Sequence, residues 1–214
     1  MWKNHRRTVL LTGLVTLLPM LPGALLWTRL PERMPTHWGL DGTVDGWSSR
    51  GFAVFGLPLL LLLMHLFCVF VSDRVDGARE QSVKVLRLLL WIIPAVSLLM
   101  GTMIYGEALG LSLPTARLGL LFVGLLLILI GNLLPKCRQN RAIGIRIRWT
   151  LEDEGNWYAT HRFAGRLWVA GGALLCLAVL LPVTVQPWVL LTVLLLLVGL
   201  PCFYSYRYAV RHSA

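Results

Sequence analysis

Three side chains that could bind a metal ion lie in a short polar segment near the N-terminus. His37, Asp41 and Asp45 follow one another at intervals of four residues. This spacing is not a recognised ligand pattern, and the alternating acidic positions of an EF-hand are missing. Each aspartate is followed by glycine, and such pairs favour turns, because glycine supplies positive φ and aspartate caps its own turn. We therefore predict an ordered, turn-rich loop over residues 29–51 and no metal site.

A second pair of titratable side chains, Glu154 and His161, could serve as an acid and a base. Their separation of seven residues is two helical turns, which places them on one face of a helix but about 10 Å apart. That distance is too long for a direct couple. The sequence carries no nucleophile motif, phosphate loop or cysteine pair beside them. We predict that the protein is not an enzyme and needs no cofactor.

The elements that position these residues are long apolar runs. The chain is 57% hydrophobic, and its charged residues leave five runs free of Asp, Glu, Lys and Arg: 8–28, 51–72, 88–106, 118–135 and 167–206. About 20 apolar residues cross a bilayer, and Pro182 and Pro187 divide the last run into two spans. These runs exclude a soluble domain and a free-standing nucleic-acid binder. We predict an all-α membrane protein with six transmembrane helices, forming one domain over residues 1–214.

Basic residues give the predicted orientation. Sixteen of the 20 Lys and Arg residues fall before the first span, in residues 73–87 and 136–166, and after the last span. The positive-inside rule places these segments and both termini in the cytoplasm. We expect a multi-pass protein of the cytoplasmic membrane, with phospholipid phosphates beside the basic start of the segment 136–166. Trp38 and Trp47 would then rest on the outer membrane surface, where an extracellular peptide could dock.

Few polar side chains lie inside the predicted spans. His65 could carry protons in a transporter, but a hydrogen bond to a neighbouring helix is the favoured interpretation. Asn132 is expected to form a similar bond across helices. Pro19, Pro22 and Gly23 predict a kink near the outer end of the first span.

The basic segment 136–166 has a pattern of its own. Residues 144–149 alternate apolar and basic side chains, as in an extended strand. Thr150 is predicted to cap a helix with Asp153 at its third position. The aromatic and small residues that follow recur at helical spacing, and they extend the helix into the fifth span; they are Trp157, His161, Gly165 and Trp168. An amphipathic helix in the membrane interface is the alternative to a functional site here.

Two motifs carry a family resemblance. The outer one runs Leu30-Pro31-x-x-Met34-Pro35-Thr36-His37-Trp38 and Gly42-x-x-Asp45-Gly46-Trp47. The inner one runs Asn140-x-x-Ile143-Gly144-Ile145-Arg146-x-x-Trp149-Thr150-Leu151, then Trp157, Thr160-His161-Arg162-x-x-Gly165 and Gly171. Together they resemble the SdpI family, bacterial multispan proteins named for immunity to a secreted killing-factor peptide, with its associated N-terminal domain of unknown function. Arg148 departs from the pattern, which has proline there.

The resemblance implies an N-terminal part at residues 1–72, an SdpI-like part at residues 118–206 and a non-enzymatic function. Its founding member protects the producing cell from a membrane-active peptide and captures a cytoplasmic repressor when the toxin is bound. No direct contact with nucleic acid is implied. The candidate inner site comprises Asn140, Gly144, Arg146, Trp149, Thr150, Trp157, His161 and Gly165. The candidate outer site comprises Pro35, His37, Trp38, Gly42, Asp45 and Gly46. A small transporter and a toxin-independent membrane regulator remain as alternatives.

Overall fold

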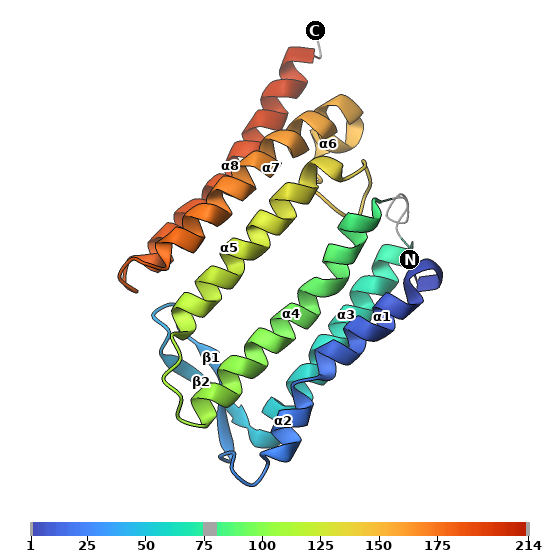
Figure 1. The fold of residues 1–214 in the computed structure, drawn as a ribbon. Helices are drawn as coiled ribbons and strands as arrows, with labels where there is room; N and C mark the ends of the chain where they lie inside the picture. The colour runs from blue at the N-terminus through green and yellow to red at the C-terminus, as the bar shows by residue number, and fades with distance from the viewer. Residues whose placement is uncertain (1, 75–80, 213–214) are drawn as a thin grey trace. The chain divides into compact units, whose positions relative to one another are not determined.

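The computed structural model describes residues 2–74 and 81–212, which form helices and one two-stranded sheet (Figure 1). The elements in chain order are α1 (Trp2–Leu17), α2 (Met20–Leu25), β1 (Arg33–Trp38), β2 (Val44–Ser49), η1 (Phe52–Gly56), α3 (Leu57–Arg74), α4 (Val83–Ala108), α5 (Thr115–Leu133), η2 (Leu134–Lys136), α6 (Arg148–Glu152), α7 (Glu154–Ala178) and α8 (Gln186–His212). Residues 75–80, within the predicted cytoplasmic segment 73–87, lie outside the described residues.

Within the part of the chain that the structure describes, five stretches are long and apolar enough to cross a membrane: Arg6–Leu25, Phe52–Ser72, Val83–Ala108, Thr115–Lys136 and Gln186–His212. They agree with five of the predicted spans, so the chain is a mostly helical, multi-pass membrane protein. The remaining predicted crossing, the fifth in chain order, falls in the apolar second half of α7. α7 begins with polar and basic residues and is not among the five stretches. Six spans and the cytoplasmic position of both termini therefore stay predictions.

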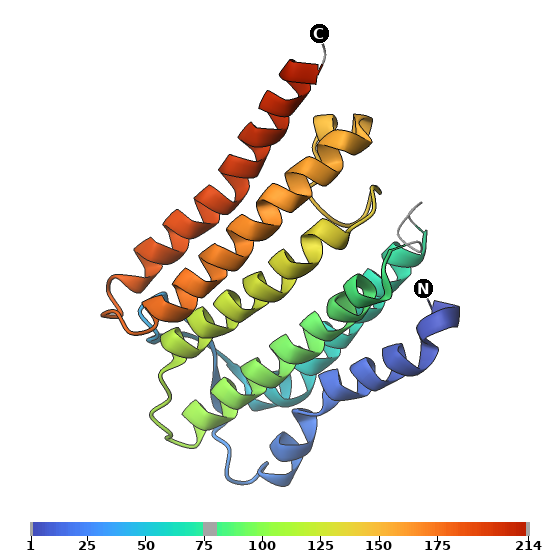
Figure 2. The ribbon, with the colours of Figure 1, turned by 45° about the horizontal axis from the view of Figure 1, so that its top comes forward.

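The chain divides into two compact units, of which the first is Met1–Asp73 with Arg87–Ala116. In this unit α1, α3 and α4 lie side by side, and the two strands lie at one end of the unit (Figures 1 and 2). Hydroxyl groups join the helices: Ser97 Oγ donates to Thr16 O at 2.7 Å, and Tyr105 Oη donates to Pro19 O at 2.7 Å. Such side-chain bonds to backbone carbonyls hold membrane helices together where water is absent.

The first predicted span is interrupted as expected. α1 ends at Leu17 and α2 begins at Met20, so the helix breaks beside Pro19. Proline lacks the amide hydrogen that an uninterrupted helix needs at this position. Gly23, on α2, packs against Val54 and Tyr105, and a β-carbon there would meet the Tyr105 hydroxyl at 2.5 Å. The prediction of a kink is confirmed, and α2 packs tightly on the core.

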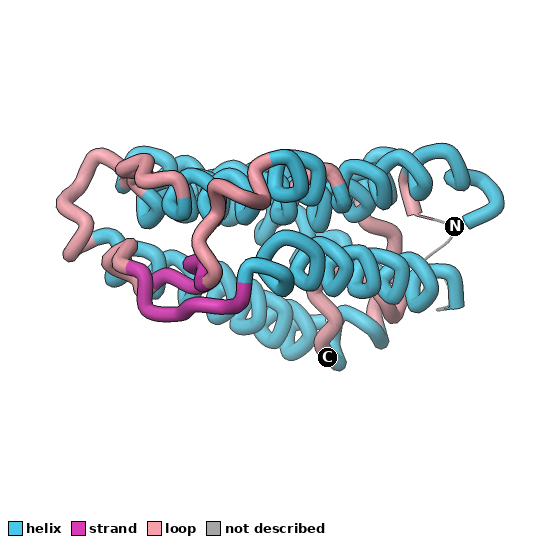
Figure 3. The backbone as a smooth tube through the Cα atoms, turned by 90° about the horizontal axis from the view of Figure 1, so that it is seen from below, coloured by secondary structure: helices cyan, strands magenta, loops and turns pink. Residues whose placement is uncertain are grey.

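The segment 29–51, predicted as an ordered, turn-rich loop, contains an antiparallel hairpin of β1 and β2, so the fold is mostly helical and not all-α (Figure 3). Arg33 pairs with Ser49, and Trp38 pairs with Val44. The register is irregular on both sides of His37. Proline at position 35 and this irregularity break the polar-apolar alternation by which a strand is recognised in a sequence. Met34, fully buried, joins the hairpin to the core of the first unit.

The second unit is Arg74–Leu86 with Arg117–Ala214, and it is built on α5, α7 and α8. Its core comprises Leu120, Leu127, Leu175, Ala178, Val193 and Leu197. The apolar run 167–206 is split as predicted, since α7 ends at Ala178 and α8 begins at Gln186. A short turn that contains Pro182 connects the two antiparallel helices.

Glycines bring α5 and α7 unusually close within the second unit. A β-carbon on Gly165 would lie 2.7 Å from Gly131 O, and one on Gly172 would lie 2.5 Å from Gly124 O. In both contacts a backbone carbonyl oxygen of α5 lies where the β-carbon of an α7 residue would be. Neither Gly165 nor Gly172 could therefore be replaced by a larger residue unless one of the helices moved. Small residues at such crossings allow membrane helices to pack backbone to backbone. This contact assigns Gly165 of the inner motif a packing role.

Candidate functional site

The inner motif folds into a compact segment on the first turns of α7. We call this segment, residues 137–161, the knot, a name that refers to its compactness and not to a knotted backbone. Gly144 has φ of +114°, and a β-carbon there would meet His161 Nε2 at 2.5 Å and the Trp157 ring at 3.1 Å. The next residue, Ile145, donates its N–H to His161 Nε2 at 2.9 Å. Because Nε2 accepts, the proton lies on Nδ1, which donates to Trp157 O at 2.8 Å. Gly144 and His161 are therefore brought together by the fold.

Trp157 and His161 form the buried floor of the knot. Both are fully buried, and their rings stack with centroids 4.0 Å apart. Trp157 Nε1 donates to Cys137 O at 2.9 Å, which ties the end of η2 to α7. Burial raises the pKa of the Cys137 thiol to about 11, so this cysteine is held as an unreactive thiol. Burial also lowers the pKa of His161, although its hydrogen bond to Trp157 acts in the opposite direction.

Asn140 shapes the start of the knot. Its Oδ1 accepts from the N–H groups of Ala142 and Ile143, both at 2.7 Å. Its Nδ2 donates to Arg138 O at 2.8 Å and to Ile143 O at 2.9 Å. All these partners are backbone groups within three residues, so the side chain substitutes for missing secondary structure. The role that this geometry supports for Asn140 is turn formation.

The predicted cap at Thr150 was wrong in its position. Thr150 is the third residue of α6, whose N-cap is Ile147, and Thr150 Oγ1 accepts from the Ile147 N–H at 3.1 Å. Asp153 instead caps α7, and its Oδ1 accepts from the Gly155 N–H at 2.7 Å. Both residues fit the preferences of caps, so the sequence pattern allowed either to begin the long helix. The buried Thr150 also contacts Ile145 O, with 2.7 Å between oxygens.

The remaining inner residues face outward or toward α8. Arg146 is exposed, and its Nη1 donates to Arg141 O at 2.8 Å. Trp149 is half-buried against Tyr206 of α8, with ring centroids 5.2 Å apart. Residues 145–147 are irregular rather than a strand, yet the arginine is exposed and the two isoleucines are half-buried. The knot therefore presents Arg146 on a rigid backbone.

Of the two Asp-Gly pairs that were predicted to form turns, only Asp41-Gly42 forms one. Asp41 Oδ1 accepts from Thr43 N–H at 3.0 Å and from Thr43 Oγ1 at 2.8 Å, and these bonds lower the pKa of Asp41. Gly42 has φ of +82°, as the turn requires. Gly46, expected in a second turn, lies in β2 instead, where a β-carbon would meet that of His37 at 2.8 Å. Its small size allows the imidazole of His37 to lie across the strand.

His37 and Asp45 form an exposed pair, with 2.5 Å between Nδ1 and Oδ1. Asp41, the third residue of the metal interpretation, is used in its own turn. Among the described residues, no group of three or more His, Cys, Asp or Glu side chains could hold a metal ion. The pair therefore fixes the two strands at the point where their register is irregular.

The base of the hairpin is held by Arg50. Its Nη1 donates to Trp27 O at 2.7 Å and to Leu30 O at 2.9 Å, and its guanidinium lies 4.5 Å from the Trp27 ring centroid. Trp38 is half-buried on the core, whereas Trp47 is 51% exposed. Only Trp47 is thus available at the surface as predicted. Pro35 pairs with Trp47 in the sheet.

Of the two polar side chains predicted inside spans, one makes the expected bond. His65, on α3, is buried with its Nε2 3.0 Å from Thr12 Oγ1 on α1. Asn132 is exposed on α5 and not buried, which corrects the expectation of a buried bond across helices. Helical periodicity alone could not place Asn132, because α5 is apolar on nearly every side.

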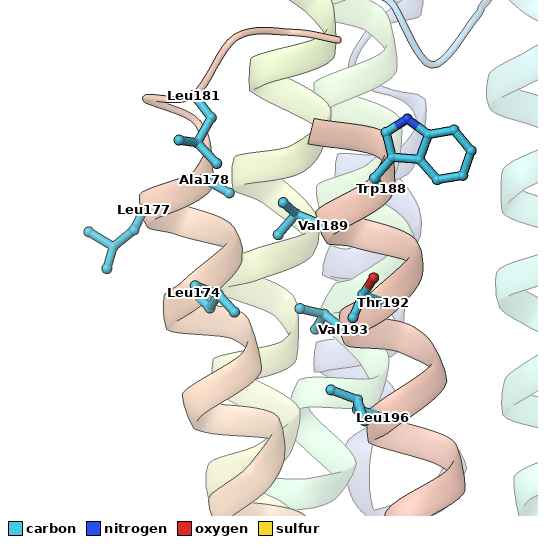
Figure 4. A pocket seen from close by; sticks show the side chains of 9 residues that line it. All are labelled: Leu174, Leu177, Ala178, Leu181, Trp188, Val189, Thr192, Val193 and Leu196. Carbon is cyan, nitrogen blue, oxygen red and sulfur yellow. The ribbon is translucent and has the colours of Figure 1, made fainter. Parts of the chain in front are cut away.

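An apolar groove of about 540 Å³ lies between α7 and α8, beside the turn that connects them (Figure 4). Figure 4 shows Val189 and Val193 directed toward α7, and Leu177 and Trp188 also line the groove. Trp188 is 70% exposed. A groove with this lining suits hydrocarbon and offers almost no hydrogen bonds to orient a polar ligand.

Several residues that hold the site together belong to none of the sequence motifs that identified site residues. Gln81 holds Arg138 by two backbone bonds, accepting from its N–H at 3.0 Å and donating to its carbonyl at 2.9 Å. Asn156 on α7 accepts from Thr160 Oγ1 and Ser205 Oγ, both at 2.8 Å, and so bonds α7 to α8. The four-residue spacing of Asn156 and Thr160 was a signal of a shared polar face. Gln81 gave no such signal, because its partner is 57 residues away.

The helices and the two ordered loops define the class of the chain as a multi-pass membrane protein with a structured segment at the end of each unit. Residues 136–205 match the SdpI/YfhL protein family, and residues 14–62 match the domain of unknown function DUF1648. The immunity protein SdpI of Bacillus subtilis (strain 168) is 27% identical over 191 residues, which cover 87% of each chain. The resemblance to the SdpI family is confirmed. No solved structure matches the chain.

Proposed function

We propose that this chain is a non-enzymatic membrane immunity protein that protects its cell from a secreted, membrane-active peptide. The observation that carries the proposal is the similarity to an immunity protein over 87% of both chains, a range that includes the hairpin and the knot. Fold alone does not give function, but here both motif-bearing loops are shared.

The proposal includes six spans, with both termini and the knot in the cytoplasm. Five apolar helices and the apolar half of α7, from Leu167 to Ala178, supply the crossings. The excess of Lys and Arg at residues 136–166 supports the cytoplasmic side, and the hairpin then lies outside the cytoplasmic membrane.

On the outer side, the hairpin is the proposed contact for the peptide. Leu40 is 71% exposed and Trp47 is 51% exposed on an otherwise polar surface. The motif residues behind them shape the strand and turn, so they support the contact surface without being its main part. An exposed tryptophan and leucine suit an apolar peptide at the membrane surface.

On the inner side, the knot is the proposed contact for a cytoplasmic repressor. Its buried residues hold the backbone, and Arg146 projects from it. A rigid backbone that carries an exposed arginine is a suitable protein-binding element. We expect capture of the repressor to follow binding of the peptide, as the family resemblance implies.

Expression in cells sensitive to the family's killing-factor peptide tests the immunity function. Survival should rise with the wild-type chain and fall back in the pair Leu40→Ser and Trp47→Ser, which leaves the hairpin bonds intact. Arg146→Ala should keep protection and lose capture of the repressor. Thr102→Ala, an exposed change on α4, is the matched control. The immunity proposal fails if correctly inserted wild-type chain protects against no cognate peptide.

The alternatives give different results in the same cells and in vesicles. A transporter would show substrate flux in proteoliposomes that disappears in His65→Ala, although His65 is already engaged by Thr12. A toxin-independent regulator would retain a DNA-binding protein in pull-down without any peptide, and would lose it when residues 141–162 are scrambled.

A further inference from the structure

α7 and α8 carry a basic face whose four arginines lie outside the knot and the hairpin. Two hollows of about 460 Å³ each lie along it and share one wall, the stacked rings of Phe163 and Tyr204, whose centroids are 4.7 Å apart. The first hollow is lined by Gly155, Tyr158, Ala159, Arg162 and Arg166 besides that wall. The second is lined by Leu200, Phe203, Arg207, Tyr208, Arg211 and His212 besides that wall.

Each hollow receives two arginines at a helical spacing of four residues. Arg162 and Arg166 lie on one face of α7, and Arg207 and Arg211 lie on one face of α8. All four are exposed, and within residues 2–74 and 81–212 none of them forms an ion pair. Arg148 differs, because it pairs with Glu152 at 3.0 Å. Four like charges gathered without a carboxylate partner call for an anion.

Acidic residues do not neutralise this face. The nearest in the chain are Asp153 and Glu154, which precede Gly155 at one end of the first hollow. Asp153 is engaged as the cap of α7 through the Gly155 N–H. Among the described side chains, no carboxylate lines either hollow. The positive charge of the face therefore remains available to a ligand.

The place of the hollows in the sequence indicates the kind of anion. Arg166 and Arg207 directly flank the charge-free run 167–206, so the arginines stand at the edge of the apolar part of both helices. The second hollow changes along α8 from Arg211 and Arg207 to Phe203 and Leu200. A headgroup phosphate beside arginines and a hydrocarbon chain beside the apolar side chains would match this order.

We propose that this face binds an anionic phospholipid from the surrounding leaflet, with its phosphate held by arginines of α7 and α8. Arginine forks bind phosphate oxygens in pairs, and tyrosine hydroxyls in both hollows can donate further hydrogen bonds. The acyl chain lies along Leu200 and Phe203. This site goes beyond the general attraction of basic loops to lipid, because two helices supply a shaped pair of hollows. The proposal does not depend on the immunity function.

The experiment uses the purified full chain in uncharged detergent, with phosphatidylglycerol or phosphatidylcholine added. Phosphatidylglycerol should raise the unfolding temperature by several degrees, and phosphatidylcholine should not. The double variants Arg162→Gln/Arg166→Gln and Arg207→Gln/Arg211→Gln should each lose most of this shift. Phosphatidylglycerol carried through purification should fall about tenfold in both, as expected for the loss of charge-assisted bonds.

The matched control is Arg29→Gln/Arg33→Gln, which removes the same charge from two exposed arginines before and at the start of β1. It should bind lipid as the wild type does. If a glutamine variant does not fold, Arg166→Lys/Arg207→Lys keeps the charge and removes the forks, and it should still reduce retained lipid severalfold.

Four results would overturn the proposal. They are equal stabilisation by the two lipids, equal loss in the control, full retention of lipid in all arginine variants, and the same stabilisation by 10 mM inorganic phosphate alone. The last result would assign the face to a free anion. Retention of an acidic protein with no difference between the lipids would assign it to a protein partner.

Discussion

The side chain of His161 leaves room only for glycine at position 144. A left-handed backbone and a ring nitrogen in the space of a β-carbon both exclude any larger residue at position 144. The two residues are 17 apart in the chain, so each motif residue makes sense only beside the other. Their shared function is to close the knot over Trp157.

Gly144→Ala should destabilise the protein by about 2 kcal/mol or more, because a positive φ and a steric conflict act together. Thermal unfolding in detergent, followed by tryptophan fluorescence, measures the change. Gly110 has positive φ but open space around it, so Gly110→Ala should lose less stability than Gly144→Ala. Gly199→Ala, in α8 with open space, should be neutral or slightly stabilising. Equal stability of the Gly144 and Gly199 variants would contradict the packing account.

His161 should make the unfolding temperature depend on pH. Burial lowers its pKa, so the native state resists a proton that the unfolded chain accepts as pH falls through about 6.5. Stability should therefore be constant well above this pH and decline as the pH falls below about 6.5. His161→Gln should flatten the decline, although it lowers stability at all pH values. A slope unaffected by His161→Gln would refute the assignment.

At the scale of elements, the hairpin depends on a single arginine at its base. Arg50→Lys keeps the charge but loses the planar guanidinium, whose Nη1 bonds both Trp27 O and Leu30 O and which lies against the Trp27 ring. Amide hydrogens of residues 33–49 should exchange about tenfold faster, the amount that charge-assisted bonds supply. Arg33→Lys, exposed on β1, should exchange as the wild type does. Unchanged exchange in the Arg50 variant would show that the buried Met34 alone holds the hairpin.

The elements differ in how well the sequence predicts them. The long helices follow from runs without charge, and the break between α7 and α8 follows from the prolines at 182 and 187. The hairpin does not, because Pro35 and an irregular register remove the alternation that marks a strand. The knot contacts could not be predicted either, since the partner of the His161 ring is the backbone N–H of Ile145, a group that carries no sequence signal. The motif indicated which residues matter but not which atoms meet.

At the scale of the whole molecule, the prediction concerns sidedness. In a variant without its four native cysteines, Leu40→Cys in the hairpin should react with a membrane-impermeant maleimide in intact cells. Arg141→Cys in the knot should react only after the membrane is opened, because positive loops stay inside. Reaction of the knot cysteine in intact cells would reverse the proposed orientation. Both positions are exposed, so reactivity should report sidedness and not burial.

The glycine contacts between α5 and α7 limit the motions open to the second unit. Two carbonyl oxygens, those of Gly131 and Gly124, face the α-carbons of Gly165 and Gly172 across the interface. A slide of either helix by one residue would put a larger side chain against one of these oxygens. Lengthwise translation is thus excluded, and α5 and α7 must move as one rigid body. The side chains that join α8 to this body are larger and can change rotamer, so a mechanical rearrangement of the unit would be a pivot of α8.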